Sequence, residues 1–312
     1  MNRQEWFNGK RWGMFTHYLP VPAGDGTGDF CSAEDWSRRI DAFDTELLAK
    51  HLHEIGADYF CITIGQNSGH YNAPNPVYDQ LTGIVPSKCA RRDLIHDIAV
   101  SLEPYGIDLW VYLPSGAPCA DQQAMEKLEW EDKGNQPGNH SRLIPFQRKW
   151  EAVIREWSLR WGKEVKGWWF DGCYFPDDMY QFSDEPNFES FAAAARAGNP
   201  DAVLGFNRGL EYPFLIQSQS DDYTAGEVGE QLPIPSQKDL ENLHGKKLHI
   251  LSYLGQWWSG GQPRFPDELV IGYSKLILAK GGVITWDAPL EPDGGIPEAY
   301  RRQMKVLNEA LK

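Results

Sequence analysis

The chain has 312 residues and a formal net charge of −14, from 30 Lys and Arg against 44 Asp and Glu. Its 24% charged and 41% hydrophobic residues are typical of a folded globular protein and exclude a disordered chain. The acidic balance argues against a nucleic-acid partner, and no apolar run approaches the ~18 residues needed to cross a membrane.

The cysteines predict a reduced, cytoplasmic protein. There are five, and they lack the Cys-x-x-Cys spacing of a structural zinc site, so a disulfide scaffold is not expected either. The N-terminus, Met1–Trp6, has no apolar segment typical of a secretion signal, although a secreted chain whose leader had been removed would look the same. No cofactor is indicated, and a homo-oligomer is compatible with the sequence.

Apolar runs of strand length alternate along the chain with segments of helical period. Most of the runs are continuous, as in strands buried on both faces. The expected strands are Gly13–His17, Tyr59–Ile64, Ile107–Leu113, Gly167–Phe170, Val203–Phe206, Tyr223–Val228, Leu248–Leu254 and Gly282–Trp286. The expected helices are Thr45–Ile55, Arg92–Glu103, Phe146–Trp161, Phe188–Ala197, Ser236–Leu243, Asp267–Ala279 and Glu298–Leu311.

This alternation predicts an α/β fold, a single (β/α)8 TIM barrel over residues 1–312. A doubly wound sheet is the alternative, but no Gly-x-Gly-x-x-Gly follows the first strand. The polar stretches Pro22–Asp35 and Ala120–Arg142 show neither helical nor strand period. Because they follow strands, we expect them at the C-terminal mouth, where barrel active sites form.

Two carboxylates are expected at strand ends in that mouth. Asp171 directly follows the apolar run Gly167–Phe170, and Glu227 ends the segment Asp222–Glu227. Two carboxylates across a sugar-sized pocket suit glycoside hydrolysis, in which one attacks the anomeric carbon and the other protonates the leaving oxygen. The 13% aromatic content, with Trp pairs, fits a site where sugar rings stack on indole. Asp222 and Glu230 are the reserve candidates for the acid.

The chain resembles the α-L-fucosidase family of retaining glycoside hydrolases over most of the expected barrel. The segments that carry the resemblance are Trp12–His17, Ile55–Tyr59, Tyr105–Leu109, Trp169–Gly172, Asn207-Arg208, Asp222–Glu227 and Gly281–Asp287. The resemblance implies a barrel in which Asp171 is the nucleophile and Glu227 the acid/base, with His17 and Arg208 in contact with the sugar.

The chain departs from that family after the second expected strand. There the family typically has Lys-His-His-Asp-Gly-Phe, whose histidines bind fucose hydroxyls, whereas this chain has Gly65-Gln66-Asn67-Ser68-Gly69-His70. Gln and Asn can also bind hydroxyls, with other donor and acceptor directions. The chain ends at Lys312, so the β-sandwich domain that commonly follows the barrel in the family is not expected.

We therefore expect a retaining hydrolase of an α-linked L-fucoside or a related deoxy-sugar glycoside. The residues expected to hold the sugar ring are His17, Gln66, Asn67, His70, Arg208 and Trp286. The alternatives are a glycosidase of different sugar specificity, an inactive carbohydrate-binding barrel, and a metal-dependent barrel enzyme. No metal site is expected, because no ligand-spacing motif unites His17, His70 and Asp171.

Overall fold

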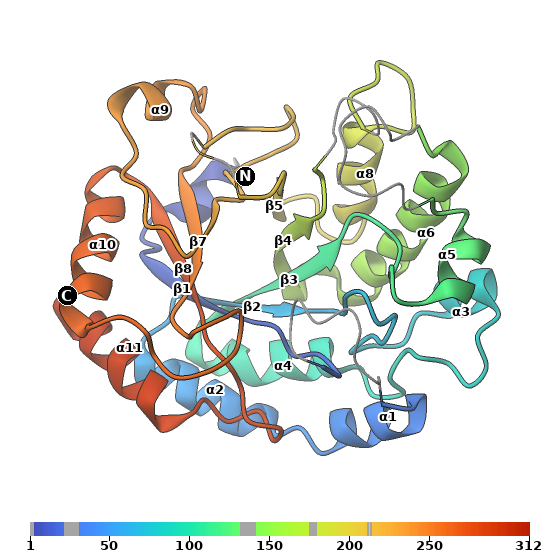
Figure 1. Cartoon of the computed structure of the whole chain (residues 1–312), viewed down its shortest axis with the longest axis horizontal. Helices are drawn as coiled ribbons and strands as arrows, with labels where there is room; N and C mark the ends of the chain where they lie inside the picture. Colours follow the sequence, from blue (N-terminus) through green and yellow to red (C-terminus); the bar gives the residue numbers. More distant parts are fainter. Residues whose placement is uncertain (1–2, 22–30, 132–141, 175–179, 211, 213) are drawn as a thin grey trace.

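The computed structural model describes residues 3–21, 31–131, 142–174, 180–210, 212 and 214–312. At its centre is one eight-stranded sheet in the order β5-β4-β3-β2-β1-β8-β7-β6, which curls so that the helices lie around its outer side (Figure 1). The strands are β1 (Trp12–Thr16), β2 (Tyr59–Thr63), β3 (Asp108–Pro114), β4 (Val165–Asp171), β5 (Val203–Phe206), β6 (Glu227–Gly229), β7 (His249–Tyr253) and β8 (Val283–Asp287).

Neighbouring strands in this order form parallel ladders, but in the described residues no ladder joins β5 to β6. The segment before β6 lies against β5 instead: Asp222 N donates to Leu204 O at 2.8 Å, and Phe206 N donates to Asp221 Oδ1 at 2.8 Å. The prediction of an α/β fold is confirmed, with eight parallel strands in barrel order. The closed ladder of a complete TIM barrel is not formed at this seam.

The sixth strand is shorter than expected because of Gly226. This glycine has φ +68°, in the left-handed region, and a Cβ there would lie 1.9 Å from His249 O. An extended strand needs negative φ, so β6 begins only at Glu227 and not at Tyr223.

Every expected helix is present, and the described part of the chain has three α-helices that were not expected. The helices are α1 (Ala33–Asp41), α2 (Thr45–Ile55), α3 (Pro76–Thr82), α4 (Leu94–Leu102), α5 (Gln122–Leu128), α6 (Ile144–Trp161), α8 (Phe188–Ala195), α9 (Gln237–Glu241), α10 (Asp267–Ala279) and α11 (Glu298–Ala310). The three that were not expected are α1, α3 and α5. None of the helices in the described part of the chain is long and apolar enough to span a membrane.

Helix α5 corrects the prediction that Ala120–Arg142 has no regular structure. It is only seven residues long, so it offers too few turns for a helical period to stand out. The start of α5 could have been predicted, because Asp is a common helix N-cap residue, and the Asp121 side chain does cap this helix by accepting from Ala124 N at 3.0 Å. Residues 132–141 of that stretch, and residues 22–30 of the other polar stretch, lie outside the described part.

Alternation along the strands decides which side chains reach the centre of the sheet. Phe15, Tyr112 and Trp169 belong to a buried cluster enclosed by the curled sheet. Their strand neighbours Met14 and Trp168 belong instead to the larger core beneath the helices. Continued at the strand ends, this period of two places inward His17, Asp171, Asn207, Glu227, Tyr253 and Asp287.

The amino-terminal end of the sheet is filled by the short 3-10 helix η1 (Arg3–Phe7). Its Phe7 packs against Trp110 and Tyr223, with ring centroids 6.3 and 5.8 Å apart. Polar strand-end side chains therefore meet solvent at the carboxyl end of the strands, which is where the candidate site forms.

Candidate active site

Asp171, the last residue of β4, has hydrogen-bond donors on both carboxylate oxygens. Tyr112 Oη donates to Oδ2 at 2.5 Å. Oδ1 accepts from Gly172 N at 2.8 Å and from Tyr174 Oη at 3.2 Å. The side-chain nitrogen of Asn207 donates to Oδ1 at 2.9 Å. Donors aimed at a carboxylate stabilise its ionised form, which is the form that a nucleophile needs.

Both phenols that contact Asp171 stay protonated donors. Burial, followed by the charge of Asp171, raises the pKa of Tyr112 well above its usual range. For Tyr174 the charge of Asp171 is the largest cause and burial the second, and its pKa is raised as well.

Asn207 joins the two predicted carboxylates. Its Nδ2 lies 2.9 Å from Asp171 Oδ1 and 2.7 Å from Glu227 Oε2. These two oxygens therefore cannot be farther apart than the sum of the two lengths, about 5.6 Å. Retaining glycosidases hold their carboxyl groups about 5–5.5 Å apart, and inverting enzymes about 6.5–9.5 Å apart.

The environment of Glu227 keeps its proton to near neutral pH. Burial, and then the negative charge of Asp171, raises the pKa of Glu227 from 4.5 to about 7, against the opposing effect of the Asn207 hydrogen bond. The result is a carboxylic acid beside an Asp171 side chain with hydrogen-bond donors on both oxygens, an arrangement that suits general acid catalysis with a carboxylate nucleophile.

Gln66 reaches this centre through Tyr112. Gln66 Nε2 donates to Tyr112 Oη at 2.8 Å, so the phenol oxygen accepts from the amide while its own hydrogen points to Asp171. The neighbouring Asn67 is partly exposed, and its carbonyl accepts from Ala120 N at 2.9 Å, which ties the loop after β2 to the segment after β3.

His17, after β1, lies in the same mouth. Its ring packs edge-on against Tyr112 and Trp258, with centroids 5.3 and 5.7 Å apart. His17 Nδ1 is 3.4 Å from Asp287 Oδ2, and Asp287 is itself fully buried and accepts from Ser259 Oγ at 2.7 Å. The imidazole is thus held beside the phenol that contacts the candidate nucleophile.

Three other predicted sugar-binding residues are placed differently. Arg208 follows Asn207 and is partly exposed. His70 is 1% exposed, and burial followed by the charge of Lys88 lowers its pKa to about 4, so its ring is neutral. Trp286 is fully buried, and its Nε1 donates to Ser274 Oγ of α10 at 3.0 Å.

The position of Trp286 follows from strand alternation. It lies one residue from Thr285 and Asp287, so its side chain points outward to the helix layer and not into the mouth. His70 is enclosed under the loop after β2. We therefore keep Arg208 among the proposed sugar contacts and leave out His70 and Trp286.

The reserve acids have other surroundings. Asp222 Oδ1 is 3.1 Å from Arg3 Nε, and its Oδ2 is 2.5 Å from a terminal nitrogen of Arg196. This buried carboxylate is neutralised near the filled end of the sheet. Glu230 directly follows the last residue of β6 and is exposed. Of the three acids, Glu227 is the one that the geometry brings to Asp171.

The contacts of Tyr112, Tyr174 and Asn207 with Asp171 and of Trp258 with His17 were not anticipated. Tyr112 could have been found, because a period of two along the strand Ile107–Leu113 places it inward near the strand end. Tyr174 and Trp258 lie in loops, and nothing in their spacing predicts the direction of their side chains.

A cleft adjoins Glu227. It has a volume of about 380 Å³ and is lined mainly by Tyr212, Glu227, Glu230, Tyr253, Trp257 and Trp258. We call it the Glu227 cleft. A larger cavity of about 560 Å³ lies between α8 and the segment 215–219, on the flank where no helix occurs in the described residues between β5 and β6.

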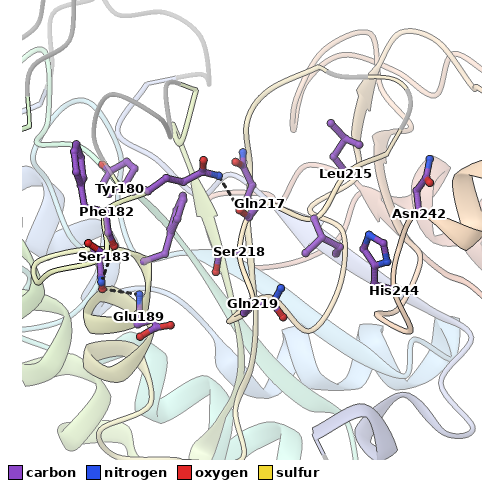
Figure 2. A pocket seen from close by; sticks show the side chains of 14 residues that line it. Tyr180, Phe182, Ser183, Glu189, Leu215, Gln217, Ser218, Gln219, Asn242 and His244 are labelled. Atoms are coloured by element: carbon purple, nitrogen blue, oxygen red, sulfur yellow. Dashed lines mark hydrogen bonds between the residues drawn. The ribbon is translucent and has the colours of Figure 1, made fainter.

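Figure 2 shows Tyr180 and Phe182 on one side of that larger cavity and Leu215, Asn242 and His244 on the other. Two of its lining residues are joined by a hydrogen bond, in which Gln181 Nε2 donates to Gln217 O at 3.0 Å. None of the residues predicted for the site lines it, so its size does not make it the active site. No group of three or more His, Cys, Asp or Glu side chains suited to a metal ion occurs among the residues that the structure describes.

No known family model matches the chain, and no curated protein does. Solved structures do. The endo-fucoidan hydrolase MfFcnA4 from glycoside hydrolase family 107 superimposes with a TM-score of 0.72 at 18% sequence identity. The match covers 99% of this chain and 53% of MfFcnA4, so this chain spans about half the length of MfFcnA4. A second endo-fucoidan hydrolase of that family, P5AFcnA, gives 0.71 at 15% identity over 100% and 94% of the two chains.

An α-L-fucosidase, AlfC, in complex with Fuca(1,6)GlcNAc, gives a TM-score of 0.65 at 14% identity over 98% of this chain and 97% of that chain. At such identities the likeness shows a shared fold, and the activity has to be argued from the site itself.

Proposed function

We propose that this chain is a glycoside hydrolase that cleaves an α-linked L-fucoside or a related deoxy-sugar glycoside with retention of anomeric configuration. The observation that carries the proposal is the Asn207 amide, which donates to both Asp171 and Glu227 and so limits two of their oxygens to a separation of about 5.6 Å. That upper limit, with the pKa of Glu227 raised to about 7 and donors on both oxygens of Asp171, suits a double displacement.

In the first step, an Asp171 oxygen attacks the anomeric carbon and forms an ester bond. The bond from that carbon to the glycosidic oxygen breaks, and the oxygen takes the proton of Glu227 as the aglycone leaves. In the second step, ionised Glu227 removes a proton from a water molecule, whose oxygen attacks the same carbon. The ester bond breaks, and both carboxyl groups return to their starting states.

The sugar would lie between His17, Asn67 and Arg208, above the Tyr112 and Asp171 pair. The solved structures of similar fold are named as acting on fucoidan and on fucosides, which makes fucose the first sugar to test. The alternative is a glycosidase that uses the same two carboxylates on a different sugar. It stays open because this chain has the amide pair Gln66-Asn67 where two imidazoles are typical of the fucosidases.

A panel of 4-nitrophenyl glycosides tests the proposal. We expect release of nitrophenol from the α-L-fucoside or a related deoxy-sugar, with the first-formed anomer, followed by NMR, retaining the substrate configuration. Asp171→Asn should lower turnover by at least about 10⁴-fold. The matched control Glu309→Gln, at an exposed position on α11, should leave turnover unchanged.

Glu227→Ala should slow the release of a poor leaving group far more than that of a good one. Azide should restore its activity by attacking the Asp171 ester in place of water and forming the α-glycosyl azide, because azide needs no general base. Full activity of Asp171→Asn would refute the proposal. Sugar binding without any turnover would point to an inactive carbohydrate-binding barrel, and loss of activity on chelation with recovery on adding metal would point to a metal-dependent enzyme.

A further inference from the structure

We propose that the Glu227 cleft is the subsite for the leaving group, and that it accepts a neutral aglycone with an apolar face, such as an aryl group or a second uncharged sugar ring. The inference rests on the proposed function and adds the class of aglycone to it.

The first support is the position of the cleft relative to the two carboxylates. Glu227 forms part of its wall, and Asp171 is absent from its lining. The general acid has to lie within hydrogen-bond reach of the glycosidic oxygen, so the aglycone begins beside Glu227. The nucleophile attacks from the opposite face of the sugar, and the space adjoining Glu227 alone is therefore on the leaving-group side.

The second support is the aromatic surface. Trp258 separates the inner site from the cleft, since its ring packs against His17 at 5.7 Å and against Tyr253 at 4.9 Å between centroids. Trp257 lies farther out, 5.8 Å from the Tyr253 ring, and is 47% exposed. Exposed indole beside a polar catalytic group is suited to stacking on the C–H face of a sugar or on an aryl ring.

The third support is charge. Glu227 and Glu230 line the cleft, and neither Lys nor Arg does among the described residues. Arg264 lies behind the wall: its guanidinium stacks on Tyr253 at 3.9 Å and donates to Gly229 O at 3.0 Å. The charge of Arg264 is thus directed to the backbone, and the described lining of the cleft offers no cation to a sulfated or carboxylated aglycone.

The test compares two substrates of the same sugar, the 4-nitrophenyl glycoside and the glycosyl fluoride, whose leaving group is one atom. Trp257→Ala should lower kcat/KM for the aryl glycoside about three- to tenfold, the range for a lost aromatic contact, and change that for the fluoride less than twofold. Trp257→Phe should restore most of the loss. The control Tyr105→Ala removes another partly exposed aromatic ring, one that stacks on His53 outside the mouth, and should change neither.

Equal losses of kcat/KM on both substrates would overturn the inference, since Trp257 would then act on the sugar or on the whole site. An unchanged kcat/KM for the aryl glycoside would overturn it as well. In both cases the proposed hydrolase activity stands, because the parent still cleaves the substrates. If the parent cleaves neither the aryl glycoside nor the fluoride of any sugar tried, the proposed function falls and this inference falls with it.

Discussion

The raised pKa of Glu227 gives the sharpest prediction, because it depends on Asp171 being close and ionised. Asp171→Asn removes a negative charge from beside Glu227, which makes the ionised form of Glu227 easier to reach. The pKa of Glu227 should therefore fall from its value of about 7.

The separation sets the size of the change. At the upper limit of about 5.6 Å, two unit charges repel by about 3 kcal/mol at an effective dielectric constant of about 20 and by about 0.7 kcal/mol at that of bulk water, and a shorter separation gives more. Burial contributes more than Asp171 to the raised pKa of Glu227. We expect a fall of about one pKa unit, which corresponds to about 1.4 kcal/mol.

The assay is a ¹³C NMR titration of protein labelled at the glutamate side-chain carbonyl, with the Glu227 signal assigned by its loss in Glu227→Gln. Asp171→Ala serves as a second variant, since it removes the charge without introducing an amide. In the parent, kcat/KM for a substrate with a poor leaving group should fall as pH rises through about 7, because Glu227 loses its proton. A Glu227 pKa that is unchanged or higher in both Asp171 variants would refute the assignment of these two groups as a coupled pair.

Four further outcomes are expected. Glu227→Gln should raise the free energy of unfolding at pH 8 by about 1–3 kcal/mol and change it little at pH 4. The reason is that the folded pKa of Glu227 is raised, so the parent protein becomes less stable as pH rises from the unfolded pKa of the carboxyl group through about 7. Equal denaturation midpoints of the two proteins at pH 8 would count against the raised pKa. Tyr112→Phe should lower kcat, because Asp171 loses its 2.5 Å donor, and an unchanged kcat would remove Tyr112 from that role. Trp286→Ala should cost about 3–5 kcal/mol of unfolding free energy with KM nearly unchanged; a large rise in KM of the folded variant would return Trp286 to the sugar site. Asp222→Asn should destabilise by about 3 kcal/mol, measured by urea denaturation, while kcat stays within a few-fold, and loss of kcat alone would reopen its candidacy as the acid.

Elements with long periodic patterns or clear caps were predictable from the sequence. Helix α2 was expected from its apolar spacing, and its start is fixed by Asp44, whose Oδ1 accepts from Leu47 N at 2.9 Å. Helices α3 and α5, with about two turns each, were not expected, and β6 is cut short by the positive φ of Gly226. These depend on single residues and on packing, which a hydrophobic period does not report.

The candidate site was predictable to the level of strand ends and no further. Asp171 and Glu227 were identified because Asp171 follows an expected strand and Glu227 lies near the end of another, and parallel strands bring their carboxyl ends to one edge. The same reasoning placed Trp286 in the mouth, because it ignored the alternation that turns residue 286 outward. The shared donor Asn207 could not be deduced from the sequence. Whether one amide nitrogen lies within hydrogen-bond distance of two carboxylates depends on exact side-chain positions, which the sequence pattern does not give.

The departure at Gly65–His70 takes on a physical meaning in this geometry. Gln66 donates to Tyr112 Oη, and Tyr112 donates to Asp171, so the residue that stands where the resemblance expects an imidazole orients the phenol towards the proposed nucleophile. An imidazole could accept the phenol hydrogen and draw it away from Asp171, whereas an amide NH₂ can only donate to the phenol oxygen. In the proposed reaction, Gln66 therefore makes no contact with the sugar, and we expect His17, Asn67, Arg208 and the Glu227 cleft to hold the substrate. A site organised in this way should owe its selectivity as much to the aglycone as to the sugar.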